Sequence, residues 1–335
     1  MSEMPLPPGL NVILGDSAAG IFRRVFRPTT EQLDIDRDVL SCGPTRACAN
    51  LDEWDSMRAR FWNSGPTDPH EPPHPRLESA VRADWLREAA RINIWAGTGL
   101  SEQLSAAFTI HLAEAGRATS GKLWIVQFEH YREGRDEVFG LGILNEEDMA
   151  RHPEPRPLSN DELQNYRDLW AAATASDPAL LENFSPSHPH ASQWLQRAAK
   201  LLLRRFPERG SGLNFWDQAL LAECTARNRK AARIVGDTIG RHWAEYDPVG
   251  DLFLFARLMG LSRASLPKPL LESSGAGTNM RETEVKLTSF GLDVVEGRAS
   301  NYPTNPIEDW AAGVRLSSRD GNLWFNDDGT LVRAS

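Results

Sequence analysis

The sequence has little cysteine and no long apolar run. Its three cysteines, Cys42, Cys48 and Cys224, form no CxxC pair, and none is flanked by histidines at zinc-finger spacing, so they predict neither a disulfide framework nor a zinc site. No stretch approaches the roughly 18 apolar residues of a membrane span, and the first residues lack the basic-then-apolar pattern of a signal peptide. We therefore expect a cytoplasmic protein with no membrane partner.

Positive charge is also scarce, because 37 lysines and arginines are set against 46 aspartates and glutamates, for a formal net charge of −9. Affinity for nucleic acid grows with the number of cations presented to the phosphates, so this balance argues against binding by the whole chain. The 41% of hydrophobic residues is ordinary globular usage. Since 335 residues exceed what one core usually organises, we expect two domains, residues 1–150 and 158–335.

The first domain alternates between strand and helix patterns. Apolar runs predict strands at 10–14, 39–44, 91–95 and 123–128, the second of them stopped by Gly43-Pro44. Helical spacing of apolar residues predicts helices over 18–26, 51–62, 76–90 and 101–115. Strands that alternate with helices give a mostly parallel sheet covered on both faces, so the expected fold is α/β with a Rossmann-like N-terminal sheet.

The second domain changes to one helix after another. Helices are expected at 160–175, 192–205, 215–227, 231–243 and 251–261. Short strands follow at 284–287, 313–316 and 322–325, with Asp327-Asp328-Gly329 as a turn. We expect a mainly helical domain that ends in a small winged-helix-like β-hairpin.

Two strand-to-helix turns carry the candidate ligand-binding residues, Gly15-Asp16-Ser17 after the first strand and Gly97-Thr98-Gly99 after the third. Both should lie at the carboxyl edge of one sheet, where helix N-termini present free N–H groups and positive dipole ends to a ligand. Such an edge suits a small anionic or nucleotide-like molecule. Neither turn has the full dinucleotide or P-loop pattern, so the sequence identifies no cofactor.

Asp16 and Ser17 are the candidate catalytic residues. Asp16 can serve as a general base or a metal ligand, and Ser17 as a nucleophile or a donor to an anion, which would fit a hydrolase or a transferase. The alternative is structural, because either side chain can also cap the following helix while Gly15 permits the turn. The same residue types fit both roles, so the sequence leaves open whether the protein is an enzyme.

Three further residues should lie near this edge. Glu102 and Gln103 open the helix after the third strand, where they either hydrogen-bond a ligand or pair with N–H groups of the first turn. Cys42 follows the predicted second strand and is either a reactive thiol near a helix N-terminus or a buried, inert one. Four histidines lie in proline-rich loops and are expected to be solvated rather than bound to a metal: His70, His74, His188 and His190.

A second class of function rests on residues 212–335. Residues 212–221 resemble the opening helix of a helix-turn-helix, and a basic cluster follows at 227–233. Together with 286–288 and the terminal strands they suggest a winged-helix layout, whose usual partner is DNA. Acidic residues outnumber basic ones from Ser211 onward, which disfavours nucleic acid. The alternative function is therefore a ligand-sensing transcriptional or protein-interaction module.

The same motifs resemble a bacterial family. A strand ending in Gly15-Asp16-Ser17, a second segment ending in Gly43-Pro44, and Trp95 followed by Glu102-Gln103 are similar in order to domain of unknown function 1835. The tail resembles the companion domain of unknown function 3658 through Leu287-Thr288, Gly291, Gly297, Trp310, Gly313-Val314 and Trp324. This resemblance implies a pocket at the carboxyl edge and no established activity; the oligomeric state is not predicted.

Overall fold

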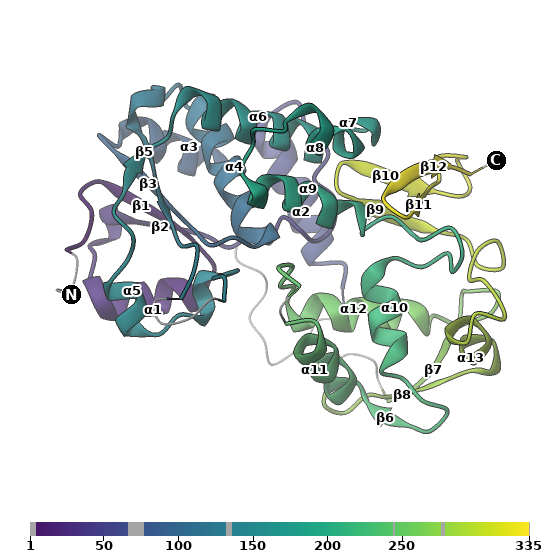
Figure 1. Ribbon diagram of the computed structural model, residues 1–335. Coiled ribbons are helices and arrows are strands. Elements are labelled where there is room, and N and C mark those ends of the chain that lie inside the picture. Colours follow the sequence, from purple (N-terminus) through teal and green to yellow (C-terminus); the bar gives the residue numbers. More distant parts are fainter. Residues whose placement is uncertain (1–4, 66–76, 132–135, 244, 276–278, 335) are drawn as a thin grey trace.

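The computed structural model describes residues 5–65, 77–131, 136–243, 245–275 and 279–334 (Figure 1). Its largest sheet has the strand order β2-β1-β3-β4-β5. The strands are β1 Leu10–Leu14, β2 Leu33–Asp36, β3 Ile92–Ala96, β4 Leu123–Gln127 and β5 Arg156–Pro157. The first four are parallel, and β5 runs antiparallel to β4. The predicted α/β fold with a mostly parallel N-terminal sheet is confirmed.

Helices cover both faces of this sheet (Figure 1). On one face lie α1 (Asp16–Phe26) and α5 (Glu146–Ala150). On the other lies α4 (Leu100–Ala115), surrounded by α2 (Leu51–Trp62), α3 (Ser79–Glu88), α6 (Asn160–Thr174) and α9 (Gln193–Leu203). Two short helices, α7 (Ala179–Glu182) and α8 (Phe184–Ser187), connect α6 to α9. None of the described helices is long and apolar enough to cross a membrane.

The pleat of the strands divides the core between the two faces, because successive side chains of a strand point to opposite sides. Val12 of β1 and Ile94 of β3 are buried on the α4 side. Their neighbours Ile13 and Trp95 are buried on the α1 side. There the Trp95 ring packs edge-on against Phe22 of α1, with 5.0 Å between ring centroids.

The second strand differs from the prediction, because β2 occupies Leu33–Asp36 and residues 39–44 form a buried loop. Arg58 donates Nη1 hydrogen bonds to the carbonyl oxygens of Cys42 (2.7 Å) and Pro44 (2.8 Å). Arg205 donates from Nε to the carbonyl oxygen of Ser41 (2.9 Å). Buried carbonyl groups need hydrogen-bond donors, and here two arginine side chains supply the donors that a neighbouring strand would otherwise supply. The apolar character of 39–44 thus reflects burial rather than strand structure.

Residues 158–206 share the core of the sheet. Leu163 and Trp170 of α6, together with Leu195 of α9, belong to the same buried cluster as Phe108 of α4. A separate hydrophobic cluster is built mainly from residues 213–294. Along this part of the chain the first cluster gives way to the second near residue 210, and the division predicted between 150 and 158 stays a prediction.

The second cluster belongs to a unit whose elements follow a winged-helix-like order, here called the winged-helix unit. Its elements are α10 (Phe215–Ala222), β6 (Arg229–Lys230), α11 (Ala231–Arg241), α12 (Asp251–Leu261), β7 (Leu271–Ser274) and β8 (Glu284–Leu287), followed by α13 (Ser289–Val295). The three strands form an antiparallel sheet of order β6-β8-β7. This order, helix–strand–helix–helix–strand–strand with the first strand beside the last, resembles that of winged-helix domains, and the β7–β8 hairpin takes the position of the wing.

The small β-hairpin expected at the end of the chain is present, but the terminal strands lie outside the β6-β8-β7 sheet and do not form its wing. They make two hairpins, β9 (Glu308–Ala311) with β10 (Val314–Ser317) and β11 (Trp324–Asp327) with β12 (Thr330–Arg333). Leu316 and Phe325 are buried in the cluster of the N-terminal sheet, and Thr45 donates its N–H to the carbonyl of Ala312 (3.1 Å). The hairpins thus close the first core.

Candidate functional site

The sheet order places the two predicted turns side by side. Since β1 and β3 are neighbours, their carboxyl ends meet at the point where one connection leads to α1 on one face and the other to α4 on the opposite face. In open α/β sheets, ligands bind at such a topological switch point. The turns Gly15-Asp16-Ser17 and Gly97-Thr98-Gly99 therefore flank the expected crevice, although their environments differ.

At the first turn, the N-terminus of α1 lacks a side-chain cap. Gly15 is the N-cap residue, with φ +81° and with its N–H donated to the carbonyl of Asp36 at 2.7 Å. Asp16 does not cap the helix; its two carboxylate oxygens accept from Nε of Arg37 at 3.0 and 3.1 Å. Ser17 is exposed beside it. The capping role considered for Asp16 and Ser17 is not seen.

At the second turn, other parts of the chain occupy the N-terminus of α4. Thr98 donates its N–H to the carbonyl of Val138 (2.7 Å), and Gly99 donates to Phe139 (3.1 Å). Leu100 donates to the carbonyl of Tyr246, also at 2.7 Å. These three N–H groups, which we expected to meet a ligand, are satisfied by main-chain oxygens.

Residues 138–144, here called the covering segment, cross from one turn to the other. Close approach to the second turn requires glycine, since a Cβ on Gly97 would lie 2.6 Å from the Val138 oxygen, and one on Gly99 would lie still closer to that of Phe139. At the first turn, a Cβ on Gly142 would lie 3.2 Å from that of Ser17. The covering segment thus seals the α4 wall of the crevice and borders the α1 wall.

Glu102 is buried beneath the covering segment, with 4% of its surface exposed. Its Oε1 accepts the N–H of Leu141 at 2.8 Å. Burial raises the pKa of this carboxyl to about 8, and main-chain N–H donors counteract the shift only in part. Glu102 is therefore mostly protonated at neutral pH, and it contacts the covering segment rather than solvent.

Gln103 and Cys42 also serve the interior. Gln103 is fully buried; its Nε2 donates to the carbonyl of Gly97 (2.6 Å) and its Oε1 accepts from the Tyr166 hydroxyl (3.0 Å), which ties α4 to α6. Burial raises the pKa of the Cys42 thiol to about 12, so it is neutral at physiological pH. Of the predicted site residues, Asp16 and Ser17 are the exposed ones.

The structure also shows a cavity that the sequence did not indicate. It has a volume of about 300 Å³ and runs beside the edge strand β2, between α1 and α3. Three arginines, Arg23, Arg37 and Arg82, line it together with Trp85. Arg37, which holds Asp16, links this cavity to the N-terminus of α1. The alternation Leu33-Asp34-Ile35-Asp36 was the signal in the sequence that could have located this strand.

Carboxylates along the same cavity are already paired. Arg82 binds Asp34 (2.9 Å) and Asp36 (3.1 Å), and Arg58 binds Asp38 at 2.6 Å. Burial raises the pKa of Asp36, and the guanidinium of Arg82 opposes this shift. These buried pairs fix β2 and the loop after it, whereas the guanidinium groups of Arg23 and Arg37 stay at the surface.

The histidines give no metal centre in the described part of the chain, where no group of three or more histidine, cysteine, aspartate or glutamate side chains could hold a metal ion. Nε2 of His188 lies 3.0 Å from an oxygen of Asp168, and its ring stacks on Phe184. His70 and His74 lie outside the described residues.

Comparison with known proteins does not assign this chain to a family. No protein-family model matches the sequence, and no curated protein is significantly similar to it. The resemblance to domains of unknown function 1835 and 3658 stays a prediction.

Proposed function

We propose that this protein binds a small anionic or nucleotide-like ligand at the carboxyl edge of its N-terminal sheet, on the α1 side of the crevice. The observation that carries the proposal is the N-terminus of α1, an 11-residue helix that starts at the switch point without a side-chain cap. The first N–H groups of a helix have no partner within the helix, and its dipole favours an anion there.

Two neighbouring side chains support an anion at this position. The Ser17 hydroxyl is exposed in the first turn, and Arg37 donates only Nε to Asp16, which leaves its terminal nitrogens for another acceptor. Arg37 also borders the 300 Å³ cavity, where the Trp85 side chain offers an apolar face for a ring. A phosphate at α1 and a base beside β2 would make a nucleotide-like ligand.

Thermal unfolding with inorganic phosphate and ADP as probes tests this proposal. Both should raise the Tm of the wild-type protein, with ADP effective at lower concentration, and Arg37→Gln and Ser17→Ala should each reduce the shift. Arg24→Gln is the matched control, because Arg24 lies on the same helix in an exposed pair with Glu146. Equal shifts in Arg37→Gln and Arg24→Gln would refute the proposal.

A hydrolase or transferase reaction is a separate hypothesis. It assigns Asp16 the role of a general base, for which the carboxylate must leave Arg37. Asp16→Asn should then abolish turnover of a phosphate ester while the unfolding transition is unchanged. Retention of turnover in a folded Asp16→Asn protein would rule out this role.

A second candidate function is that of a ligand-sensing transcriptional or protein-interaction module that uses the winged-helix unit. Arg257 is the only basic residue of α12, and it pairs with Asp217 (2.6 Å) and Asp309 (2.7 Å). The helix that would enter a DNA groove thus presents no free cation. In the basic cluster, Arg229 pairs with Asp237 and Lys230 with Glu284.

Binding of duplex DNA by the full chain, measured at several salt concentrations, distinguishes a nucleic-acid partner from a protein partner. We expect no affinity at low salt, where phosphate contacts are strongest. Binding that weakens steeply with added salt would restore the nucleic-acid hypothesis.

A further inference from the structure

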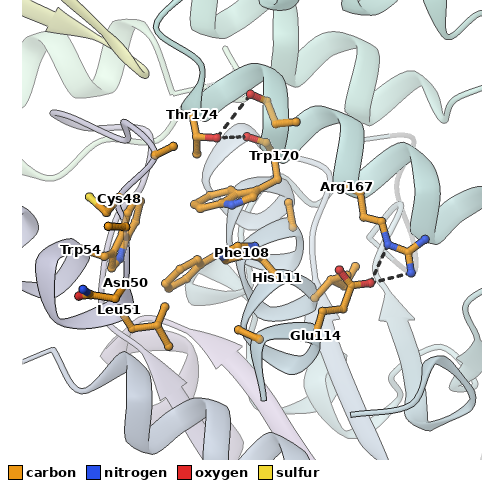
Figure 2. Close-up of a pocket in the computed structure, with 16 residues that line it drawn as sticks. Cys48, Asn50, Leu51, Trp54, Phe108, His111, Glu114, Arg167, Trp170 and Thr174 are labelled. Carbon is orange, nitrogen blue, oxygen red and sulfur yellow. Dashed lines mark hydrogen bonds and ion pairs between the residues drawn. The ribbon is translucent and has the colours of Figure 1, made fainter. Parts of the chain in front are cut away.

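A larger cavity, of about 580 Å³, lies between the start of α2, the second half of α4 and α6 (Figure 2). It begins about two helical turns along α4 from Leu100, so it is distinct from the carboxyl-edge turns. An engineered cavity of about 150 Å³ already accepts a benzene molecule. This cavity is several times larger and falls in the size range of small-molecule sites.

Three aromatic rings from three helices form its wall. Trp54 of α2 lies 5.2 Å from Phe108 of α4 and 5.4 Å from Trp170 of α6, measured between ring centroids. Phe108 and Trp170 are 5.1 Å apart. Figure 2 shows the three side chains gathered on one side of the cavity, with Glu114 and Arg167 on the other. Such a wall suits a planar apolar ring.

One polar group of this wall lacks a partner. Trp54 is only 4% exposed, yet its indole Nε1 has no hydrogen-bond acceptor within the described part of the protein. Buried tryptophan N–H groups normally find an acceptor, and an unsatisfied buried donor costs about 1–3 kcal/mol. A bound molecule that carries an acceptor would remove this cost.

The remaining polar groups offer no unpaired charge. Burial lowers the pKa of His111, so its imidazole is neutral at neutral pH. At the rim, Glu114 and Arg167 neutralise each other in an ion pair of 2.6 Å. The Cys48 thiol is neutral, because partial burial raises its pKa, and Sγ lies 3.5 Å from the carbonyl oxygen of Arg46. An uncharged molecule therefore fits better than an ion.

We infer that this cavity is a second binding site, for an uncharged planar heteroaromatic molecule whose ring nitrogen or carbonyl oxygen accepts the Trp54 indole N–H. The ring would pack against Trp54, Phe108 and Trp170. This site is separate from the anion site proposed at the N-terminus of α1, although Trp54 and Phe108 border both this cavity and the one beside β2.

Quinoline and naphthalene, which share their shape and differ by one ring nitrogen, are the probes that test this inference. In a ¹⁵N–¹H spectrum of the full chain, the Trp54 indole signal is identified by its disappearance in Trp54→Phe. Quinoline should move this signal downfield in a saturable way and bind about tenfold more tightly than naphthalene, the worth of one hydrogen bond. Equal affinity for the two probes would overturn the assigned role of Trp54.

A cavity-filling variant locates the probe. Trp54 and Phe108 also border the cavity beside β2, whereas Ala171 lines only the aromatic one. Ala171→Leu should reduce quinoline affinity at least tenfold at unchanged Tm, while Ala222→Leu, at an exposed alanine of α10, should leave it unchanged. Unaltered quinoline binding in Ala171→Leu, or a Trp54 signal that never saturates, would overturn the inference.

Discussion

The two strand-to-helix turns of the sheet look alike in sequence and differ in the folded protein. At Gly97-Thr98-Gly99, the N–H groups of three successive residues are bound to carbonyl oxygens of distant segments. At Gly15-Asp16-Ser17, the helix begins without a side-chain cap, and its acidic residue is held by Arg37. The Gly97-Thr98-Gly99 turn is therefore a structural joint. The Gly15-Asp16-Ser17 turn offers free N–H donors at the same edge of the sheet.

This difference shows that a helix N-terminus is available to a ligand only when the rest of the chain leaves it open. The covering segment reaches the α4 turn because Gly97 and Gly99 admit main-chain atoms at close range. Gly15 has open space around its Cβ position and serves instead to permit a positive φ. Glycine therefore has a different structural role in each of the two turns.

The largest effect expected from a single substitution at a fixed pH concerns the glycines of the two turns. Gly99→Ala should cost about 3 kcal/mol of unfolding free energy, because its Cβ displaces the main chain of Phe139. Gly15→Ala should cost only about 1 kcal/mol, the strain of a left-handed φ in open space. Urea unfolding measures both, with Gly121→Ala, which meets no atom within 4 Å, as the control. Equal costs at positions 15 and 99 would contradict the account.

A second effect, smaller than this for each pH unit, concerns Glu102 beneath the covering segment. Its folded pKa of about 8 lies above the unfolded value, so the unfolded chain binds fewer protons between these two pKa values and stability falls as pH rises through this window. The loss should approach about 1.4 kcal/mol per pH unit between about pH 5 and pH 8.

Glu102→Gln should remove this part of the pH dependence, because the amide keeps the oxygen that accepts from Leu141 and never ionises. Unfolding free energies of both proteins at several pH values give the difference directly. A difference that does not change between pH 5 and pH 8 would show that Glu102 is already ionised in the folded state.

The smallest effect is expected at Asp16. Its pair with Arg37 is exposed, with 66% of the Asp16 side chain accessible, and such pairs contribute less than about 1 kcal/mol. Asp16→Asn should therefore change the unfolding free energy by no more than about 0.5 kcal/mol. A larger loss would mean that Asp16 stabilises the turn in the way a capping residue does.

Much of the fold could be predicted from sequence. The apolar runs of β1, β3 and β4 and the 3.6-residue spacing of α2, α4 and α12 are local signals, and these elements lie within a residue or two of the prediction. The second strand was missed for a physical reason: β2 is a short edge strand with an acidic residue at every second position, while 39–44 is apolar because arginines bury it.

The site was harder to predict than the fold. Gly15, Asp16 and Ser17 were placed correctly at the end of β1, since a strand-turn-helix pattern is local. The hydrogen bonds of Thr98 and Glu102 depend on residues about 40 positions away in the covering segment. The hydrogen bond of Leu100 depends on Tyr246. No spacing in the sequence reports such contacts, and the same holds for the rings that meet around the aromatic cavity.

The most direct test of the central claim is a phosphate titration followed by backbone amide signals in ¹⁵N–¹H spectra. The account predicts saturable shifts for Asp16 and Ser17 at the start of α1 and none for Thr98, Gly99 and Leu100, whose N–H groups are already bound. Shifts at Thr98–Leu100 with none at Ser17 would contradict it.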